Sequence, residues 1–160
     1  MSPPAARRQP ERGPHDARGV AVALLARRDY ATAELRAALR ARAFADETLD
    51  ETLAALRREG VLDDARFAEN YVSYQAARGQ GPVRIAAALR QRGLDDTLID
   101  AALAREDDWT ARARKARRAK FGARAPDTWA EKAKQARFLQ YRGFSSDHIR
   151  SATGADPEMD

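Results

Sequence analysis

Hydrophobic residues along most of the chain recur three or four positions apart, which is the spacing of one face of an α-helix. Two clear examples are the sets Leu49, Leu53 and Leu56, and Phe67, Tyr71 and Tyr74. From Val20 onward no stretch alternates hydrophobic and polar residues as a half-buried β-strand would. Residues at helical spacing share one face, which neighbouring helices must cover. The pattern predicts an all-α protein.

Glycine, proline and small polar residues divide this pattern into about nine expected helices of roughly 8 to 16 residues. The residues expected to cap helix N-termini are Asp29, Asp46, Asp64, Asp96, Asp108 and Ser146. The residues expected to end helices in the left-handed conformation are Gly60, Gly93, Gly122 and Gly143. Pro82 and Pro126 are expected to open new helices, because the first amides of a helix have no intrahelical acceptor.

The chain resembles itself when it is shifted by fifty residues, without a gap. The matching columns are Leu39, Leu89 and Leu139; Arg42, Arg92 and Arg142; Ala43, Gly93 and Gly143; Phe44, Leu94 and Phe144; and Leu49, Ile99 and Ile149. Each copy holds a helix, a stop residue, a large hydrophobic residue in the turn, and a second helix. A further helix is expected before each pair, over residues 17–28, 64–78 and 107–121. The sequence therefore predicts three tandem three-helix repeats.

This repeat divides the chain into five expected segments. They are a disordered basic tail at 1–17, repeats at 18–62, 63–106 and 107–153, and a disordered C-terminal tail at 154–160. We expect the repeats to stack into an elongated, curved helical solenoid. In the third copy Gln135 and Thr153 occupy positions that are hydrophobic in the other two. We interpret them as the outer face of a terminal repeat, which meets water.

The composition adds an expectation about partners. The chain has 29 Lys and Arg against 24 Asp and Glu, a net charge of +5, and 44% hydrophobic residues, enough for a core. This balance favours a polyanionic partner such as nucleic acid, a nucleoprotein or an acidic protein surface. Charges on solvated helix faces would produce the same totals.

The residue inventory argues against catalysis. There is no cysteine, and the two histidines, His15 and His148, have no spaced partner. The acidic doublets Asp63–Asp64, Asp95–Asp96 and Asp107–Asp108 precede helices, so capping explains them better than a metal site. Gly79-Gln80-Gly81-Pro82 is expected to be a sharp turn, since it matches no nucleotide-binding motif. We expect no metal, no cofactor and no membrane span, and a cytoplasmic location.

Arginines recur at equivalent positions late in the middle helix of each repeat. The candidate partner-binding residues are Arg40 and Arg90, the column Arg42, Arg92 and Arg142, and the neighbouring Arg78, Arg84 and Arg137. Gln140 interrupts the column that contains Arg40 and Arg90. Equivalent positions of a solenoid lie on one side, so these arginines are expected to form a stripe. Cations also stabilise helix C-termini, and both roles stay open.

Aromatic residues suggest a second kind of contact, because they can stack on single-stranded bases. Phe67, Tyr71 and Tyr74 have core spacing, so packing is the expected role for them. Trp109, Trp129, Phe138 and Tyr141 are less regular, which leaves room for one at an interface.

Four stretches of sequence resemble the RecX family of regulatory proteins. They are Leu62-Asp63-Asp64-Ala65-Arg66-Phe67-Ala68-Glu69-Asn70-Tyr71-Val72, Arg78-Gly79-Gln80-Gly81-Pro82-Val83-Arg84-Ile85, Leu89-Arg90-Gln91-Arg92-Gly93-Leu94, and residues 131–144. The resemblance covers about residues 18–153. One departure is Ser73, Tyr74 and Gln75, where the family commonly carries basic residues.

The resemblance implies both a fold and a function. It implies three tandem three-helix repeats and binding to the filament of the RecA recombinase. RecX-like proteins restrain the ATPase, strand-exchange and co-protease activities of RecA, and so damp recombination and the SOS response. We expect a monomer that contacts neighbouring RecA subunits and opposes their relative motion. The alternative is a basic helical protein that binds single- or double-stranded DNA directly.

Overall fold

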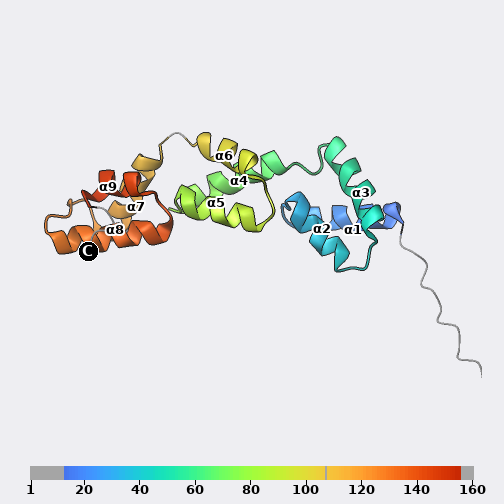
Figure 1. The fold of residues 1–160 in the computed structure, drawn as a ribbon, viewed down its shortest axis with the longest axis horizontal. Coiled ribbons are helices and arrows are strands. Elements are labelled where there is room, and N and C mark those ends of the chain that lie inside the picture. Colours follow the sequence, from blue (N-terminus) through green and yellow to red (C-terminus); the bar gives the residue numbers. More distant parts are fainter. Residues whose placement is uncertain (1–12, 107, 156–160) are drawn as a thin grey trace, which may run out of the picture. The chain divides into compact units, whose positions relative to one another are not determined.

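The computed structural model describes residues 13–106 and 108–155, which fall into two compact units, one ending at Asp63 and one beginning at Asp64. Within these ranges the chain forms nine α-helices and no strand (Figure 1). None of these helices is long and apolar enough to cross a membrane. The expected tail residues 1–12 and 156–160 lie outside the described ranges. The all-α prediction is confirmed.

The first unit contains α1 (Pro14–Leu25), α2 (Thr32–Arg40) and α3 (Asp46–Arg58). Ala17 and Ala21 of α1 are fully buried in a core with Leu35, Leu39 and Leu49. Residues 14–17, which were expected in the disordered tail, therefore belong to α1. The helix can begin at Pro14 because a first-turn amide has no intrahelical partner, and the burial of Ala17 holds its first turn in place.

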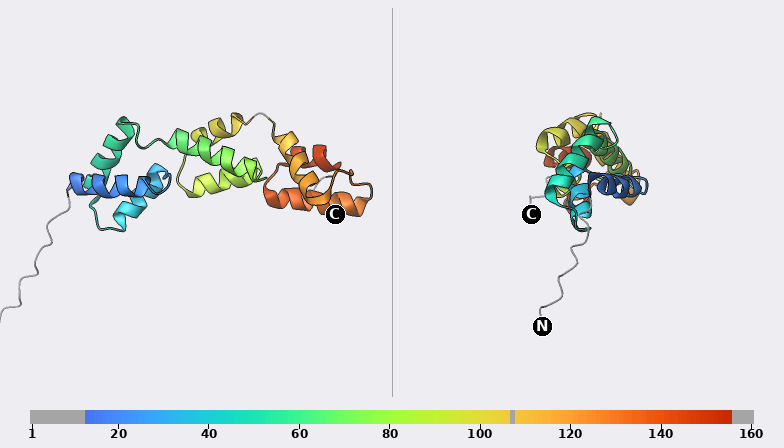
Figure 2. Two further views of the ribbon diagram at one scale, coloured as in Figure 1. Left: turned by 180° about the vertical axis from the view of Figure 1, so that it is seen from behind. Right: turned by 90° about the vertical axis from the view of Figure 1, so that its right-hand side faces the viewer.

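The second unit contains two further triplets. Its helices are α4 (Asp64–Ala77), α5 (Pro82–Gln91), α6 (Asp96–Ala104), α7 (Trp109–Phe121), α8 (Trp129–Arg142) and α9 (Ser146–Thr153). Within every triplet of the described residues each helix contacts the other two, and the left-hand view in Figure 2 shows the three helices of each triplet grouped together. The three-helix repeat is confirmed.

Residues in the matching columns occupy equivalent places in the three cores. Leu39, Leu89 and Leu139 are fully buried, and the column that contains Leu49, Ile99 and Ile149 is fully buried as well. The turn before the third helix has the same backbone in each copy, with positive φ at Ala43 (63°), Gly93 (83°) and Gly143 (93°). The repeat register read from the sequence is therefore the register of the fold.

The helix ends follow the predictions for glycine better than those for the N-caps. Gly60, Gly93, Gly122 and Gly143 all have positive φ, as expected. Asp108 caps α7 by accepting the Ala111 amide, and Pro82 opens α5. The predicted caps Asp46, Asp96 and Ser146 are instead the first helical residues, and the preceding residue is the cap in each case. In all three turns the cap is the second residue after the left-handed position and has an extended backbone.

Three other helix starts also differ from expectation. The N-cap of α2 is Ala31, two residues beyond Asp29, and Glu34 accepts the Ala31 amide. Asp64 is the first residue of α4 and not its cap. The helix expected to open at Pro126 begins at Trp129, because Thr128 and Glu131 form a reciprocal capping box. Hydrogen bonds from the backbone amides of Asp127 and Thr128 lower the pKa of the Glu131 carboxyl, which favours its charged form beside the α8 N-terminus.

The sequence suggested that Gln135 and Thr153 of the third repeat face water, but both side chains are buried. Gln135 is only 7% exposed, and its Oε1 accepts from the Arg117 guanidinium at 3.3 Å. Arg117 is itself buried and also donates to the carbonyls of Gly122 and Arg124. Thr153 is buried, and its hydroxyl donates to the Ile149 carbonyl. The prediction of a solvated outer face at these two positions was wrong, because internal hydrogen bonds satisfy them.

Candidate nucleoprotein-binding surface

Two of the predicted arginines form the same ion pair in two repeats. Arg40 contacts Asp46 at 2.8 Å, and Arg90 contacts Asp96 at 2.8 Å. Each pair joins the end of the middle helix to the first turn of the third helix. In the third repeat both members are replaced, by Gln140 and Ser146. The paired replacement indicates that Arg40 and Arg90 serve the turn, although both remain more than half exposed.

The arginines of the 42, 92 and 142 column make three different contacts. Arg42, in the turn just after α2, donates to the Ala38 carbonyl of that helix at 2.8 Å, the helix-end role that the sequence allowed. Arg92 lies over the ring of Tyr71, with 4.9 Å to the centroid. Arg142 donates to the Arg78 carbonyl at 3.5 Å. Arg40 and Arg42 belong to the first unit and the other predicted arginines to the second, so a stripe through all three repeats stays a prediction.

The turn Gly79-Gln80-Gly81-Pro82 of the second repeat packs against the end of α8 in the third repeat. The Gly81 amide donates to the Arg142 carbonyl at 2.7 Å, and the Val83 amide donates to the Gly143 carbonyl at 2.9 Å. Carbonyls at the end of α8, which have no partner within their helix, thus accept hydrogen bonds from amides at the start of α5, which have none either. A Cβ on Gly81 would fall inside van der Waals contact with backbone atoms of Gly143 and Phe144. The glycines serve a close backbone approach between repeats.

Three predicted arginines gather at this junction. Arg84 donates to the Tyr141 carbonyl at 3.2 Å and lies over the Tyr141 ring. Arg78 donates to the Tyr74 hydroxyl at 2.8 Å, while its carbonyl accepts from Arg142. These contacts use part of each guanidinium and leave other N–H groups available. Arg137 is exposed on α8 and does not line the pocket beside the junction.

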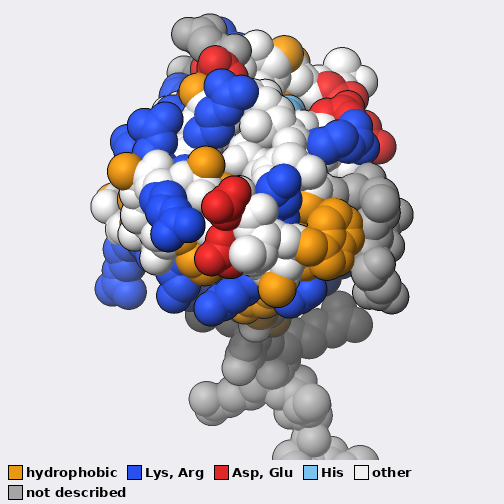
Figure 3. Space-filling view, turned by 90° about the vertical axis from the view of Figure 1, so that its left-hand side faces the viewer, with side chains coloured by type: hydrophobic (Ala, Val, Ile, Leu, Met, Phe, Trp, Pro, Cys, Tyr) orange, Lys and Arg blue, Asp and Glu red, His pale blue; other side chains and the backbone are white. Residues whose placement is uncertain are grey.

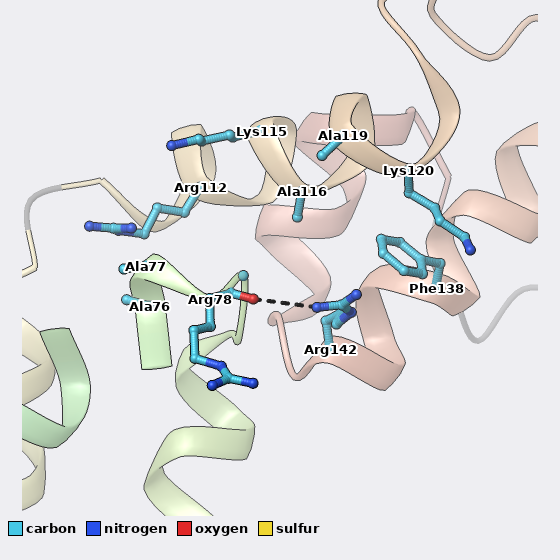
Figure 4. A pocket seen from close by; sticks show the side chains of 11 residues that line it. Ala76, Ala77, Arg78, Arg112, Lys115, Ala116, Ala119, Lys120, Phe138 and Arg142 are labelled. Carbon is cyan, nitrogen blue, oxygen red and sulfur yellow. Dashed lines mark hydrogen bonds between the residues drawn. The ribbon is translucent and has the colours of Figure 1, made fainter. Parts of the chain in front are cut away.

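A pocket of about 290 Å³ lies beside the junction, within the second unit. Figure 4 shows it between α7, the end of α4 and the last turns of α8. Five of its lining side chains are cationic: Arg78, Arg112, Lys115, Lys120 and Arg142. Four alanines and Phe138 form the rest of its side-chain lining. We call this pocket, with these five cations, the inter-repeat groove.

The cations of the inter-repeat groove differ in how they are held. Arg112 is paired with Glu106. Arg142 lies over the Phe138 ring at 5.0 Å, and Phe121 contacts the same ring edge-on. Lys115 and Lys120 are exposed and make no hydrogen bond or ion pair with the part of the chain that the structure describes. The two lysines are therefore the groups most available to a bound anion.

Positive charge is concentrated in the third repeat. Residues 108–155 contain twelve Lys and Arg and four Asp and Glu, a net charge of +8, whereas the whole chain carries +5. In α7 six of thirteen residues are basic and none is acidic. Figure 3 looks toward the α7–α9 triplet and shows Lys and Arg over much of that face. Sequence reasoning missed Arg112, Lys115 and Lys120, although charge counted by repeat would have found them.

The histidine of the second unit, His148, takes part in a helix cap. Ser145 Oγ lies 2.8 Å from His148 Nδ1 and caps α9. Burial lowers the pKa of the His148 imidazole, which favours its neutral form. No group of three or more His, Cys, Asp or Glu within the described ranges could hold a metal ion.

Both repeats of the second unit are similar in sequence to domains of known proteins. The second three-helix domain of RecX matches residues 63–103, and the third matches residues 106–153. A regulatory protein RecX from Halorhodospira halophila is 46% identical over 144 residues, covering 89% of each chain. This chain belongs to the RecX family. The RecX of Stenotrophomonas maltophilia is 42% identical over 139 residues, covering 86% of this chain and 85% of the relative.

Solved RecX structures share the fold. The crystal structure of RecX from Lactobacillus salivarius matches with a TM-score of 0.78 at 20% identity, over 87% of this chain and 93% of that one. A second crystal structure of a regulatory protein RecX matches with a TM-score of 0.70 at 22% identity, over 87% and 72% of the two chains. The resemblance first seen in the motifs is thus confirmed in sequence and in fold.

Proposed function

We propose that this RecX-family chain binds the RecA nucleoprotein filament and modulates it, mainly by inhibition. The affected activities are the ATPase, strand exchange and co-protease activities, so the chain damps recombination and the SOS response in the cytoplasm. It acts by binding and catalyses no reaction. The observation that carries the proposal is the membership of a regulatory family together with the +8 charge of residues 108–155. A filament of protein on DNA is a polyanion that such a surface attracts.

Inhibition requires only that the chain bind one state of the filament better than another. A difference of about 1.4 kcal/mol in binding free energy shifts the balance between two filament states tenfold. Three similar modules in one chain give it the means to contact more than one RecA subunit. Such a bridge opposes the relative motion of subunits that accompanies ATP turnover.

A gel-shift series tests this proposal against direct DNA binding. We expect the chain to shift RecA-coated single-stranded DNA at concentrations at least tenfold below those that shift the bare strand. Both titrations are run at several salt concentrations, because contacts to phosphates give a steep decrease in affinity with salt. RecA on its own, without DNA, is the control for simple protein association. Equal affinity for bare and coated DNA would favour the DNA-binding alternative.

A further inference from the structure

The inter-repeat groove has chemistry that selects among polyanions. Its side chains carry hydrogen-bond donors and no acceptor, because the lining residues other than the five cations are Ala, Gly and Phe. An extended peptide brings an N–H as well as a C=O at each residue, and a buried N–H without an acceptor is costly. A phosphodiester backbone brings only acceptors. The groove therefore fits a nucleic-acid backbone better than an acidic peptide.

An exposed aromatic ring stands next to the same groove. Tyr74 is 59% exposed, although its spacing predicted a place in the core. Its hydroxyl accepts from the guanidinium of Arg78, which lines the groove, and that guanidinium lies 5.4 Å from the Tyr74 ring centroid. Cationic grooves flanked by exposed aromatic rings are the usual way of binding single strands, whose unpaired bases can stack. In a duplex the bases are already stacked.

We propose that the inter-repeat groove binds the phosphodiester backbone of a single-stranded nucleic acid, with a base stacked on Tyr74. Lys115 and Lys120 neutralise phosphates, while Arg78 and Arg142 donate to their oxygens. The alanines of α4 and α7 let the strand approach closely, since they project little beyond the backbone. The site goes beyond the proposed regulation of RecA, because it recognises the strand and requires no recombinase.

The test measures binding of the full chain to a short fluorescent oligothymidylate by anisotropy, over a series of salt concentrations and without RecA. For single strands the slope of log affinity against log salt is about −0.7 for each phosphate neutralised. We expect Lys115→Gln/Lys120→Gln to make the slope shallower by about 1.4. The matched control is Lys132→Gln/Lys134→Gln, two lysines of the same repeat outside the groove. The control is expected to keep the wild-type slope, and equal changes in both variants would overturn the site.

Substitutions of the aromatic ring separate stacking from charge. Tyr74→Ala is expected to weaken binding about tenfold without changing the salt slope, because no charge is removed. Tyr74→Phe keeps the ring and is expected to bind as the wild type does. Loss of affinity in both variants would overturn the stacked base and leave only a hydrogen-bonding role for the hydroxyl.

Two further ligands decide the kind of partner. A duplex of the same length is expected to bind more weakly than the single strand, and equal affinity would overturn the choice of a single strand. A glutamate-rich peptide is expected not to displace the oligonucleotide at equal charge. Efficient displacement that is lost in Lys115→Gln/Lys120→Gln would reassign the groove to an acidic protein segment. Because RecA is absent throughout, failure here leaves the proposed function standing.

Discussion

Replacing Gly81 with alanine is expected to lower the free energy of unfolding of the second unit by about 2 to 5 kcal/mol. Gly81 has an ordinary extended backbone, so alanine is not strained by its own φ of −92°. The cost comes from the new Cβ, which meets the backbone of Gly143 and Phe144 and cannot be relieved by a side-chain movement. Separating the two backbones also breaks the hydrogen bonds from Gly81 and Val83.

Urea denaturation followed by tryptophan fluorescence measures this effect, because both tryptophans, Trp109 and Trp129, lie in the third repeat. The control is Gly19→Ala, followed by far-UV circular dichroism. A Cβ at Gly19 meets nothing, and this residue lies inside α1, so alanine is expected to stabilise that helix by about 0.5 to 1 kcal/mol. Glycine-to-alanine substitution is thus expected to lower the free energy of unfolding at Gly81 and to raise it at Gly19. A change under about 0.5 kcal/mol at Gly81 would contradict the close junction.

Replacing Leu89 with alanine is expected to cost about 2 to 5 kcal/mol of unfolding free energy. The Leu89 side chain is fully buried, and its equivalents Leu39 and Leu139 are buried to the same degree. Truncation removes hydrophobic contacts and leaves a cavity that a close-packed core fills only in part. The control is Val83→Ala on the same helix, where the side chain is 57% exposed and the expected change is under about 0.5 kcal/mol.

The two substitutions together report whether the second and third repeats unfold as one body. Leu89 lies in the second repeat, whereas the fluorescent residues lie in the third. If the junction couples the repeats, Leu89→Ala in the otherwise wild-type chain lowers the urea concentration at which tryptophan fluorescence reports unfolding. In the Gly81→Ala background we expect that shift to shrink, because the third repeat no longer depends on the second. An unchanged shift in the double variant would mean that contacts other than the junction couple the two repeats.

Sequence reasoning found the parts of the fold that occur three times. The core columns and the left-handed turn residues appear in every copy, so a shifted comparison places them in register. Features that occur once leave no such trace. The approach of Gly81 to Gly143 joins a turn of one repeat to a helix end of the next, and neither position has an equivalent contact elsewhere in the second unit. The buried pair of Arg117 and Gln135 is also confined to one repeat.

The candidate site was only partly accessible to the same reasoning. The recurring arginines include Arg142, which lines the groove, but also Arg40 and Arg90, whose contacts are ion pairs with the next helix. Arg78, which also lines the groove, was chosen only as a sequence neighbour of the recurring positions. Lys115 and Lys120 do not recur and were missed. Tyr74 was expected in the core because it follows Tyr71 by three residues, yet the buried face of α4 runs through Ala68, Val72 and Ala76, and Tyr74 lies outside it. Helical spacing predicts which residues share a face but not which of two overlapping faces the neighbouring helices cover.

The most direct measurement is the RecA ATPase on single-stranded DNA, titrated with wild type, Lys115→Glu/Lys120→Glu and the control Lys132→Glu/Lys134→Glu. The three proteins are first matched by circular dichroism. We expect wild type and control to inhibit at similar concentrations, and the groove variant to need at least tenfold more protein. Inhibition by the groove variant at the wild-type concentration would contradict a role for the groove in the filament contact. An ATPase that none of the three proteins lowers would contradict the proposed function itself.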